Sequence, residues 1–185
     1  MSLEYASLGF LSYKPITGYE LKKIFDSSVK HFWSADQSQI YRTLGKLTEA
    51  GMTEVERVEQ TDRPDRKVYH ITPTGRQAFQ EWLRGPFPMQ ESKSGPLVQV
   101  FFAGQMNEEE LLAKFQTAAE IFRTVLHRYE QVPFQIDEIL EKVPSPREHY
   151  FWMLTLDLGL RTMRAQLEWA EEIISAIQNK RIPPE

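Results

Sequence analysis

The stretch SQIYRTLGKLTEAG, residues 38–51, decides the fold that the sequence predicts. Its apolar positions are Ile40, Leu44 and Leu47. They are spaced by four and by three residues, which is the spacing of one buried helix face. Gly51 then supplies a typical helix stop, so we expect a helix from about Asp36 to Ala50.

A hairpin is predicted immediately after this helix. Two strand-like runs, Met52–Glu59 and Lys67–Thr72, are separated by QTDRPDR, which has the proline and aspartates of a hairpin loop. The following segment, PTGRQAFQEWL, returns to helical spacing and places Phe79 and Trp82 on one face. We therefore expect a two-stranded ribbon closed by a further helix.

Two short helices are predicted before residue 36. The first ends at Lys14, because a residue that precedes proline avoids the helical region. The second begins after Thr17, which forms a capping box with Glu20. The order helix, helix, helix, hairpin, helix predicts a winged helix-turn-helix, and the chain is expected to be mainly α with a small β-hairpin wing.

The polar face of the third helix is the candidate DNA reader, because a helix in the major groove needs one edge of hydrogen-bonding side chains. Cations near the tip of the hairpin could hold the DNA backbone beside the groove. A solvated helix face is the alternative. The predicted DNA-binding residues are Tyr19, Gln37, Ser38, Gln39, Tyr41, Arg42, Lys46, Arg63, Arg66, Lys67 and Tyr69. For Tyr69 we favour a core position with its hydroxyl group at the surface over a phosphate contact.

Three segments of this half resemble the PadR-like family of bacterial transcriptional regulators. They are ITGYEL at Ile16–Leu21, SQIYRTLGKLTEAG at Ser38–Gly51 and KVYHITPTG at Lys67–Gly75. Arg42 stands where many members of the family have proline. The second half resembles longer members, including virulence-gene activators, through LVQVFFAGQMNEEEL at Leu97–Leu111. The resemblance implies DNA binding, regulation of transcription by repression, and a helical C-terminal dimerisation domain.

Composition divides the chain into two halves. Residues 1–84 carry 12 Lys and Arg against 11 Asp and Glu, whereas residues 85–185 carry 10 against 15. The stretch GPFPMQESKSGP separates two helical patterns. We therefore predict a winged helix-turn-helix domain over residues 1–84, a linker over 85–96, and a helical dimerisation domain, with a possible effector site, over 97–185.

The last helix, from about Arg147, carries an apolar seam that alternates steps of three and four residues. The seam consists of Met153, Leu156, Leu160, Met163, Leu167, Ala170, Ile174 and Ile177. An additional apolar set, Phe151, Leu154 and Leu158, lies on a neighbouring face. Two apolar faces need two partners, so we favour a homodimer through the seam over packing within one chain.

An apolar effector cavity is also considered near the dimer interface. The candidate lining residues are Phe101, Phe102, Trp152 and Trp169. Simple core packing of these aromatic residues is the favoured alternative. If a ligand binds, we expect a small apolar or aromatic molecule.

Other classes of protein are disfavoured by the sequence. There are no cysteines, and His31, His70, His127 and His149 show no ligand spacing, so neither a metal nor another cofactor is predicted. Nucleotide-loop, hydrolase and metalloprotease motifs are missing, which argues against an enzyme. With no recognisable signal peptide or membrane span, we expect a cytoplasmic protein without membrane contact. A winged helix that binds only proteins remains the alternative function.

Overall fold

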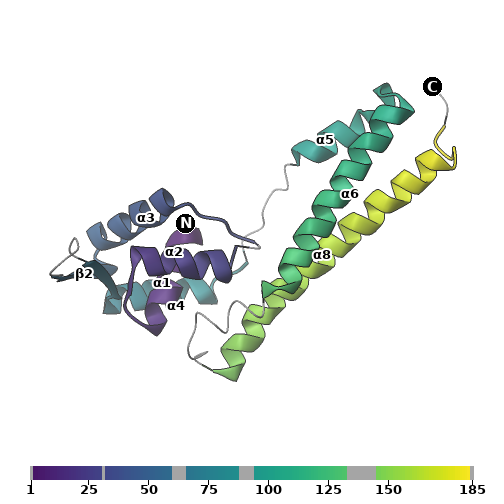
Figure 1. Cartoon of the computed structure of the whole chain (residues 1–185). Helices are drawn as coiled ribbons and strands as arrows, with labels where there is room; N and C mark the ends of the chain where they lie inside the picture. The colour runs from purple at the N-terminus through teal and green to yellow at the C-terminus, as the bar shows by residue number, and fades with distance from the viewer. Residues whose placement is uncertain (1, 31, 60–65, 88–93, 133–144, 184–185) are drawn as a thin grey trace. The chain divides into compact units, whose positions relative to one another are not determined.

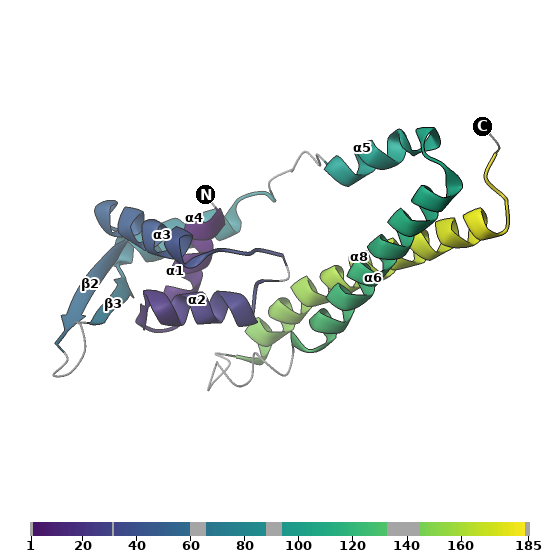
Figure 2. The same cartoon turned by 45° about the horizontal axis from the view of Figure 1, so that its top comes forward.

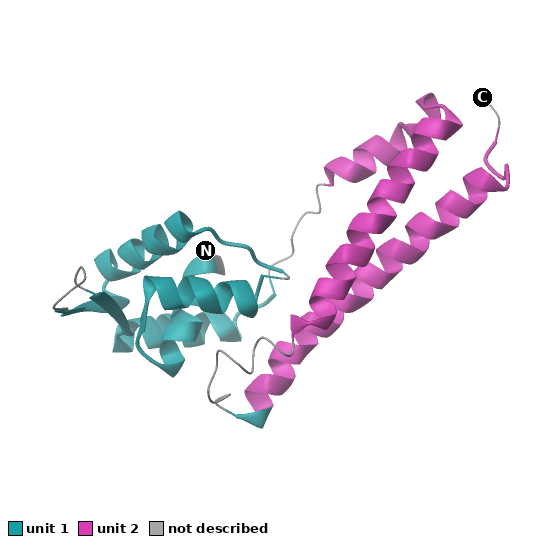
Figure 3. Cartoon of the chain, viewed as in Figure 1, with its two compact units in different colours: residues 1–87, 135–146 teal, residues 88–134, 147–185 magenta. Residues whose placement is uncertain are grey.

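The computed structural model describes residues 2–30, 32–59, 66–87, 94–132 and 145–183 (Figure 1). The chain divides into two compact units (Figure 3). Unit 1 comprises residues 1–87 and 135–146, and unit 2 comprises residues 88–134 and 147–185.

Unit 1 is a small helical domain with a three-stranded sheet. Its helices are α1 (Ser2–Tyr13), α2 (Gly18–Ser27), α3 (Gln37–Glu49) and α4 (Pro73–Arg84), and its strands are β1 (Ile16–Thr17), β2 (Thr53–Val58) and β3 (Arg66–Ile71). The strands lie in the order β1-β3-β2 and all pairs are antiparallel. Strand β3 is therefore central, with Tyr69 opposite Ile16 on one side and Val55 on the other.

Local sequence fixes both helices of the helix-turn-helix. At α2, the Thr17 hydroxyl accepts a hydrogen bond from the Glu20 backbone N–H, and the Glu20 carboxylate accepts one from the Thr17 backbone N–H. Asp36 and Gln39 make the same reciprocal pair at the start of α3. Gly51, with φ of 68°, ends that helix in the left-handed region that glycine adopts readily.

The core of unit 1 lies between α1, α2, α3 and the sheet. Its fully buried members include Leu11, Leu21, Phe25, Ile40 and Leu44. Helix α4 packs on α1, where the Trp82 ring stacks on Tyr5 with 4.8 Å between centroids. The helix-turn-helix is thus held on one side by α1 and on the other by the sheet.

Unit 2 contains α5 (Gly95–Phe101), the 3-10 turn η1 (Ala103–Gln105), α6 (Glu108–Glu130) and the long α8 (Pro146–Gln178). Helices α6 and α8 run side by side in both views (Figures 1 and 2). Leu111, Phe115 and Ala119 of α6 pack with Ala170 and Ile177 of α8. No helix of the described residues has the length and apolar character needed to cross a membrane.

The predicted fold class is confirmed: the chain is mainly helical, with an N-terminal winged helix-turn-helix. Strand β1 was not predicted. Its two residues are too few to show an alternating pattern, and its pairing with β3 depends on residues about fifty positions away.

Candidate nucleic-acid interface

Helix α3 buries its apolar residues, together with Thr43, and exposes most of its polar ones. Ile40, Leu44 and Leu47 are buried in the core. The exposed positions are Glu49, in the last turn, and six residues before it: Gln37, Ser38, Gln39, Tyr41, Arg42 and Lys46. All six are predicted DNA-binding residues, so the structure brings them together on one solvent-facing surface, which we call the α3 stripe. A Cβ at Gly45 would meet nothing within 4 Å, so the backbone there is open to a close neighbour.

Tyr41 lies directly over the beginning of α2. A Cβ built on Gly18 would approach the Tyr41 Cζ to 2.8 Å, so only glycine leaves room for the ring as it stands. Tyr19, next to Gly18, is exposed. The α3 stripe therefore continues onto the first turn of α2, a contact that sequence reasoning missed because it joins two helices.

Tyr69 is buried, with 6% of its surface exposed. Burial raises the pKa of its phenol, and the neighbouring Tyr41 adds to the effect. This environment matches the core position favoured from the sequence. The two tyrosines link the central strand of the sheet to the α3 stripe.

The two described cations at the start of β3 have different surroundings. Arg66 donates from Nη2 to Glu20 Oε1 at 2.6 Å, whereas Lys67 is exposed and has no ion-pair partner among the described residues. Arg57 on β2 lies opposite Lys67 in the register. Arg63, also predicted to bind DNA, falls outside the described residues.

Glu20 is a residue whose wider role the sequence did not reveal. Its Oε2 accepts hydrogen bonds from the Thr17 N–H at 2.7 Å and the Thr17 hydroxyl at 2.8 Å. Partial burial raises the pKa of the Glu20 carboxyl, but hydrogen bonds from Thr17 and the Arg66 guanidinium outweigh it and leave the pKa below its usual value. The capping-box motif signalled the contact with Thr17. Nothing local signals Arg66, 46 residues away.

The predicted seam of α8 lies inward within the single chain. Leu156, Ala170 and Ile177 are buried, and the other five seam residues are half-buried. Leu167, Ala170, Ile174 and Ile177 belong to the core shared with α6. Contact between two copies through this seam stays a prediction.

A different set of apolar side chains is exposed in unit 2. On α5 and just after it they are Leu97, Val98, Phe101 and Phe102, and on α6 there is Ile121. On α8 they are Tyr150, Phe151, Leu154, Leu158 and Trp169. The α8 set contains Phe151, Leu154 and Leu158, which the sequence placed on a face beside the seam. We call these three residues the outer face of α8.

A groove of about 910 Å³ lies between α5, α6 and α8. Phe115, Phe122 and Trp169 supply aromatic lining, and Lys114 and Gln166 supply polar groups. Phe115 and Trp169 meet edge to face with 5.6 Å between ring centroids. Of the four predicted effector residues, Trp169 lines this groove, whereas Phe101, Phe102 and Trp152 are not among its lining residues.

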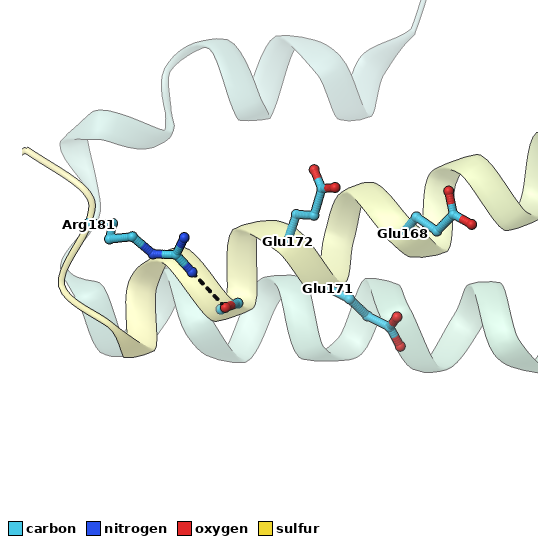
Figure 4. A pocket seen from close by; sticks show the side chains of 5 residues that line it. Glu168, Glu171, Glu172 and Arg181 are labelled. Carbon is cyan, nitrogen blue, oxygen red and sulfur yellow. Dashed lines mark hydrogen bonds between the residues drawn. The ribbon is translucent and has the colours of Figure 1, made fainter.

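A second hollow, of about 570 Å³, lies near the end of α8 (Figure 4). Glu168, Glu171, Glu172, Ser175 and Arg181 line it. Three of these residues are already engaged: Arg181 donates to the Ser175 hydroxyl at 2.9 Å, and Glu171 pairs with Arg123 at 2.6 Å. The described residues contain no group of three or more His, Cys, Asp or Glu side chains placed to hold a metal ion.

Comparison with known proteins identifies both halves of the chain. Residues 8–81 match the model of the transcriptional regulator PadR-like family, and residues 93–178 match that of the virulence activator alpha C-terminal region. The negative transcriptional regulator PadR of Bacillus subtilis is 27% identical over 95% of this chain and 97% of its own length. The probable transcriptional regulator Rv1176c of Mycobacterium tuberculosis is 28% identical over 98% and 100%.

Solved structures agree with the sequence comparison. The crystal structure of Bacillus subtilis PadR in complex with operator DNA has a TM-score of 0.80 at 27% identity, covering 96% of this chain and 99% of that chain. A structure of the same protein with p-coumaric acid has a TM-score of 0.75 at 25% identity, with the same coverage. The Vibrio cholerae virulence activator AphA has a TM-score of 0.73 at 25% identity over 96% and 99%. The chain is a DNA-binding transcriptional regulator and not an enzyme, and it belongs to the PadR-like family.

Proposed function

We propose that the chain binds an inverted-repeat operator as a homodimer and represses transcription of the neighbouring genes. The observation that carries the proposal is the α3 stripe, a continuous polar surface on a helix whose opposite face is buried. The related PadR of Bacillus subtilis, named a negative regulator, is known in complex with operator DNA.

Base reading is assigned to the first half of the α3 stripe. Gln37 and Gln39 stand in the first turn, where amide side chains can pair with adenine edges, and Arg42 can form two hydrogen bonds to guanine. Gln39 is also the capping partner of Asp36, so its amide must leave that contact to reach a base. Lys67 of the wing would contact the DNA backbone, since it is exposed and carries an unpaired positive charge among the described residues.

Dimerisation is assigned to unit 2. Exposed apolar residues on α5 and on the outer face of α8 would be covered by a second copy of the chain. A two-fold dimer presents two α3 helices, and this matches the symmetry of an inverted repeat. The burial of the α8 seam within the chain favours the outer face over the seam as the dimer contact.

A small aromatic effector is assigned to the groove between α5, α6 and α8. The groove offers aromatic walls from Phe115 and Trp169, with Lys114 available for an acidic group. The relative from Bacillus subtilis is known with p-coumaric acid, which is such a molecule.

The test is a fluorescence-anisotropy titration on genomic fragments, with random-sequence duplex as competitor, followed by nuclease footprinting of a selected fragment. We expect a selected fragment to contain an inverted repeat, to be protected over both half-sites, and to lose affinity steeply as salt increases. Arg42→Ala should reduce discrimination between fragments. A protein that binds no fragment at low salt would favour a winged helix that contacts only proteins, and a footprint over one half-site would contradict the dimer.

A further inference from the structure

The Glu20 carboxylate joins two parts of the DNA-binding unit that the sequence keeps apart. One oxygen closes the capping box at the start of α2, and the other accepts from Arg66, the first residue of β3. Both oxygens are therefore occupied. The contact joins the guanidinium of a wing arginine to the start of the helix-turn-helix.

The pair is accessible to solvent. The Arg66 and Glu20 side chains are 46% and 42% exposed. An ion pair with this exposure is weak and reversible, and it is further weakened by salt. It nevertheless places a negative charge within 2.6 Å of one guanidinium nitrogen, at the surface where the wing would meet phosphates.

The neighbouring wing cations differ from Arg66 because they lack an acidic partner among the described residues. Arg57 and Lys67 face each other across β2 and β3, and neither has an ion-pair partner among the described residues. The contact between His70 Nε2 and Glu56 Oε2, at 2.8 Å across the same two strands, involves neither of these cations. Arg66 is thus the described wing cation whose charge is already balanced by the protein.

We propose that Glu20 masks Arg66, so that the wing makes one phosphate contact fewer than its count of basic residues implies. The inference rests on the proposed contact between the wing and the DNA backbone. Each phosphate neutralised by a protein cation adds about 0.9 to the slope of log affinity against log salt. Masking therefore lowers that slope and reduces sequence-independent binding.

The decisive variant is Glu20→Gln, which removes the charge while glutamine can still complete a capping box. We expect the salt slope on a random-sequence duplex to steepen by about 0.9, which makes the affinity gain between 200 and 50 mM salt about 3.5-fold larger than that of the parent. Arg66→Ala alone should leave the slope unchanged. The double variant Glu20→Gln with Arg66→Ala should return to the parental slope.

Glu54→Gln is the matched control, because it removes the same charge from an exposed position on β2 that has no ion-pair partner among the described residues. Thermal unfolding of each variant checks that α2 remains capped. The proposal is overturned if Glu54→Gln steepens the slope equally, if Arg66→Ala alone makes it shallower, or if Glu20→Gln weakens binding at an unchanged slope. A parent that binds no DNA would contradict the proposed function as well, whereas these three outcomes contradict the masking alone.

Discussion

Leu156 and Leu158 lie two residues apart on α8, and their truncation should affect two different properties: the stability of the single chain for Leu156 and the affinity of the dimer for Leu158. In the single chain Leu156 is 2% exposed and Leu158 is 67% exposed. Leu156→Ala removes a buried side chain and leaves a cavity, so the free energy of unfolding should fall by about 2 to 5 kcal/mol. Leu158→Ala should leave the folding of one chain almost unchanged.

The loss of dimerisation free energy expected for Leu158→Ala follows from the part of the side chain that is exposed in the single chain. Full burial of a leucine side chain contributes about 1.5 to 3 kcal/mol, and two-thirds of that is roughly 1 to 2 kcal/mol for each protomer. A two-fold interface contains the residue twice, so a dimer should lose about 2 to 4 kcal/mol. The dissociation constant should then rise roughly 30- to 1,000-fold.

The assay must separate folding from association, because dissociation and unfolding are linked in a dimer. Sedimentation equilibrium over a concentration series gives the dissociation constant, and urea unfolding at several protein concentrations gives the stability. A Leu158→Ala protein that dimerises as tightly as the parent would refute the outer face of α8 as the contact. If Leu156→Ala weakened the dimer but left the free energy of unfolding of the single chain unchanged, the seam itself would be the interface.

Three further outcomes are expected. Gly18→Ala should displace the Tyr41 ring and leave the melting temperature nearly unchanged. Operator binding should weaken about fivefold, which corresponds to the loss of one hydrogen bond of about 1 kcal/mol. An unaltered operator affinity would show that Tyr41 does not contact the DNA. Arg42→Ala should cost about 1 to 3 kcal/mol on the operator and much less on random duplex, and equal losses on both would make Arg42 a backbone contact. Because the pKa of Tyr69 is raised in the folded protein, the stability that its neutral phenol contributes is present below pH 10 and is lost as the pH rises through the higher pKa of the folded state. In an ultraviolet titration, Tyr69→Phe should remove a phenol that ionises late. Loss of a phenol that ionises early would contradict the burial of Tyr69.

Features coded within a few residues were predictable from the sequence. The Thr17 and Glu20 capping box, the buried triplet Ile40, Leu44 and Leu47, and the stop at Gly51 all lie as expected. Each depends on helix geometry over one or two turns, which sequence spacing reports directly.

Features that depend on pairing between distant segments were not predictable. The α8 pattern correctly indicates a helix with a long apolar face, but it does not say which helix covers that face, and α6 of the same chain covers its second half. The ion pair of Glu20 with Arg66 likewise depends on how β3 is placed beside α2. From the sequence, Arg66 and Lys67 are two equivalent cations of the wing. Only the structure distinguishes them, because Arg66 pairs with Glu20 and Lys67 has no ion-pair partner among the described residues.

The sheet order β1-β3-β2 also bears on solubility. A sheet edge offers unpaired backbone groups to other chains, and natural proteins protect edges by shortness or by charge. Strand β1 has only two residues, and β2 carries Glu54, Glu56 and Arg57 along its length. Both edges are thereby made poor templates for intermolecular strand addition, so the wing can stay exposed at high protein concentration without promoting aggregation.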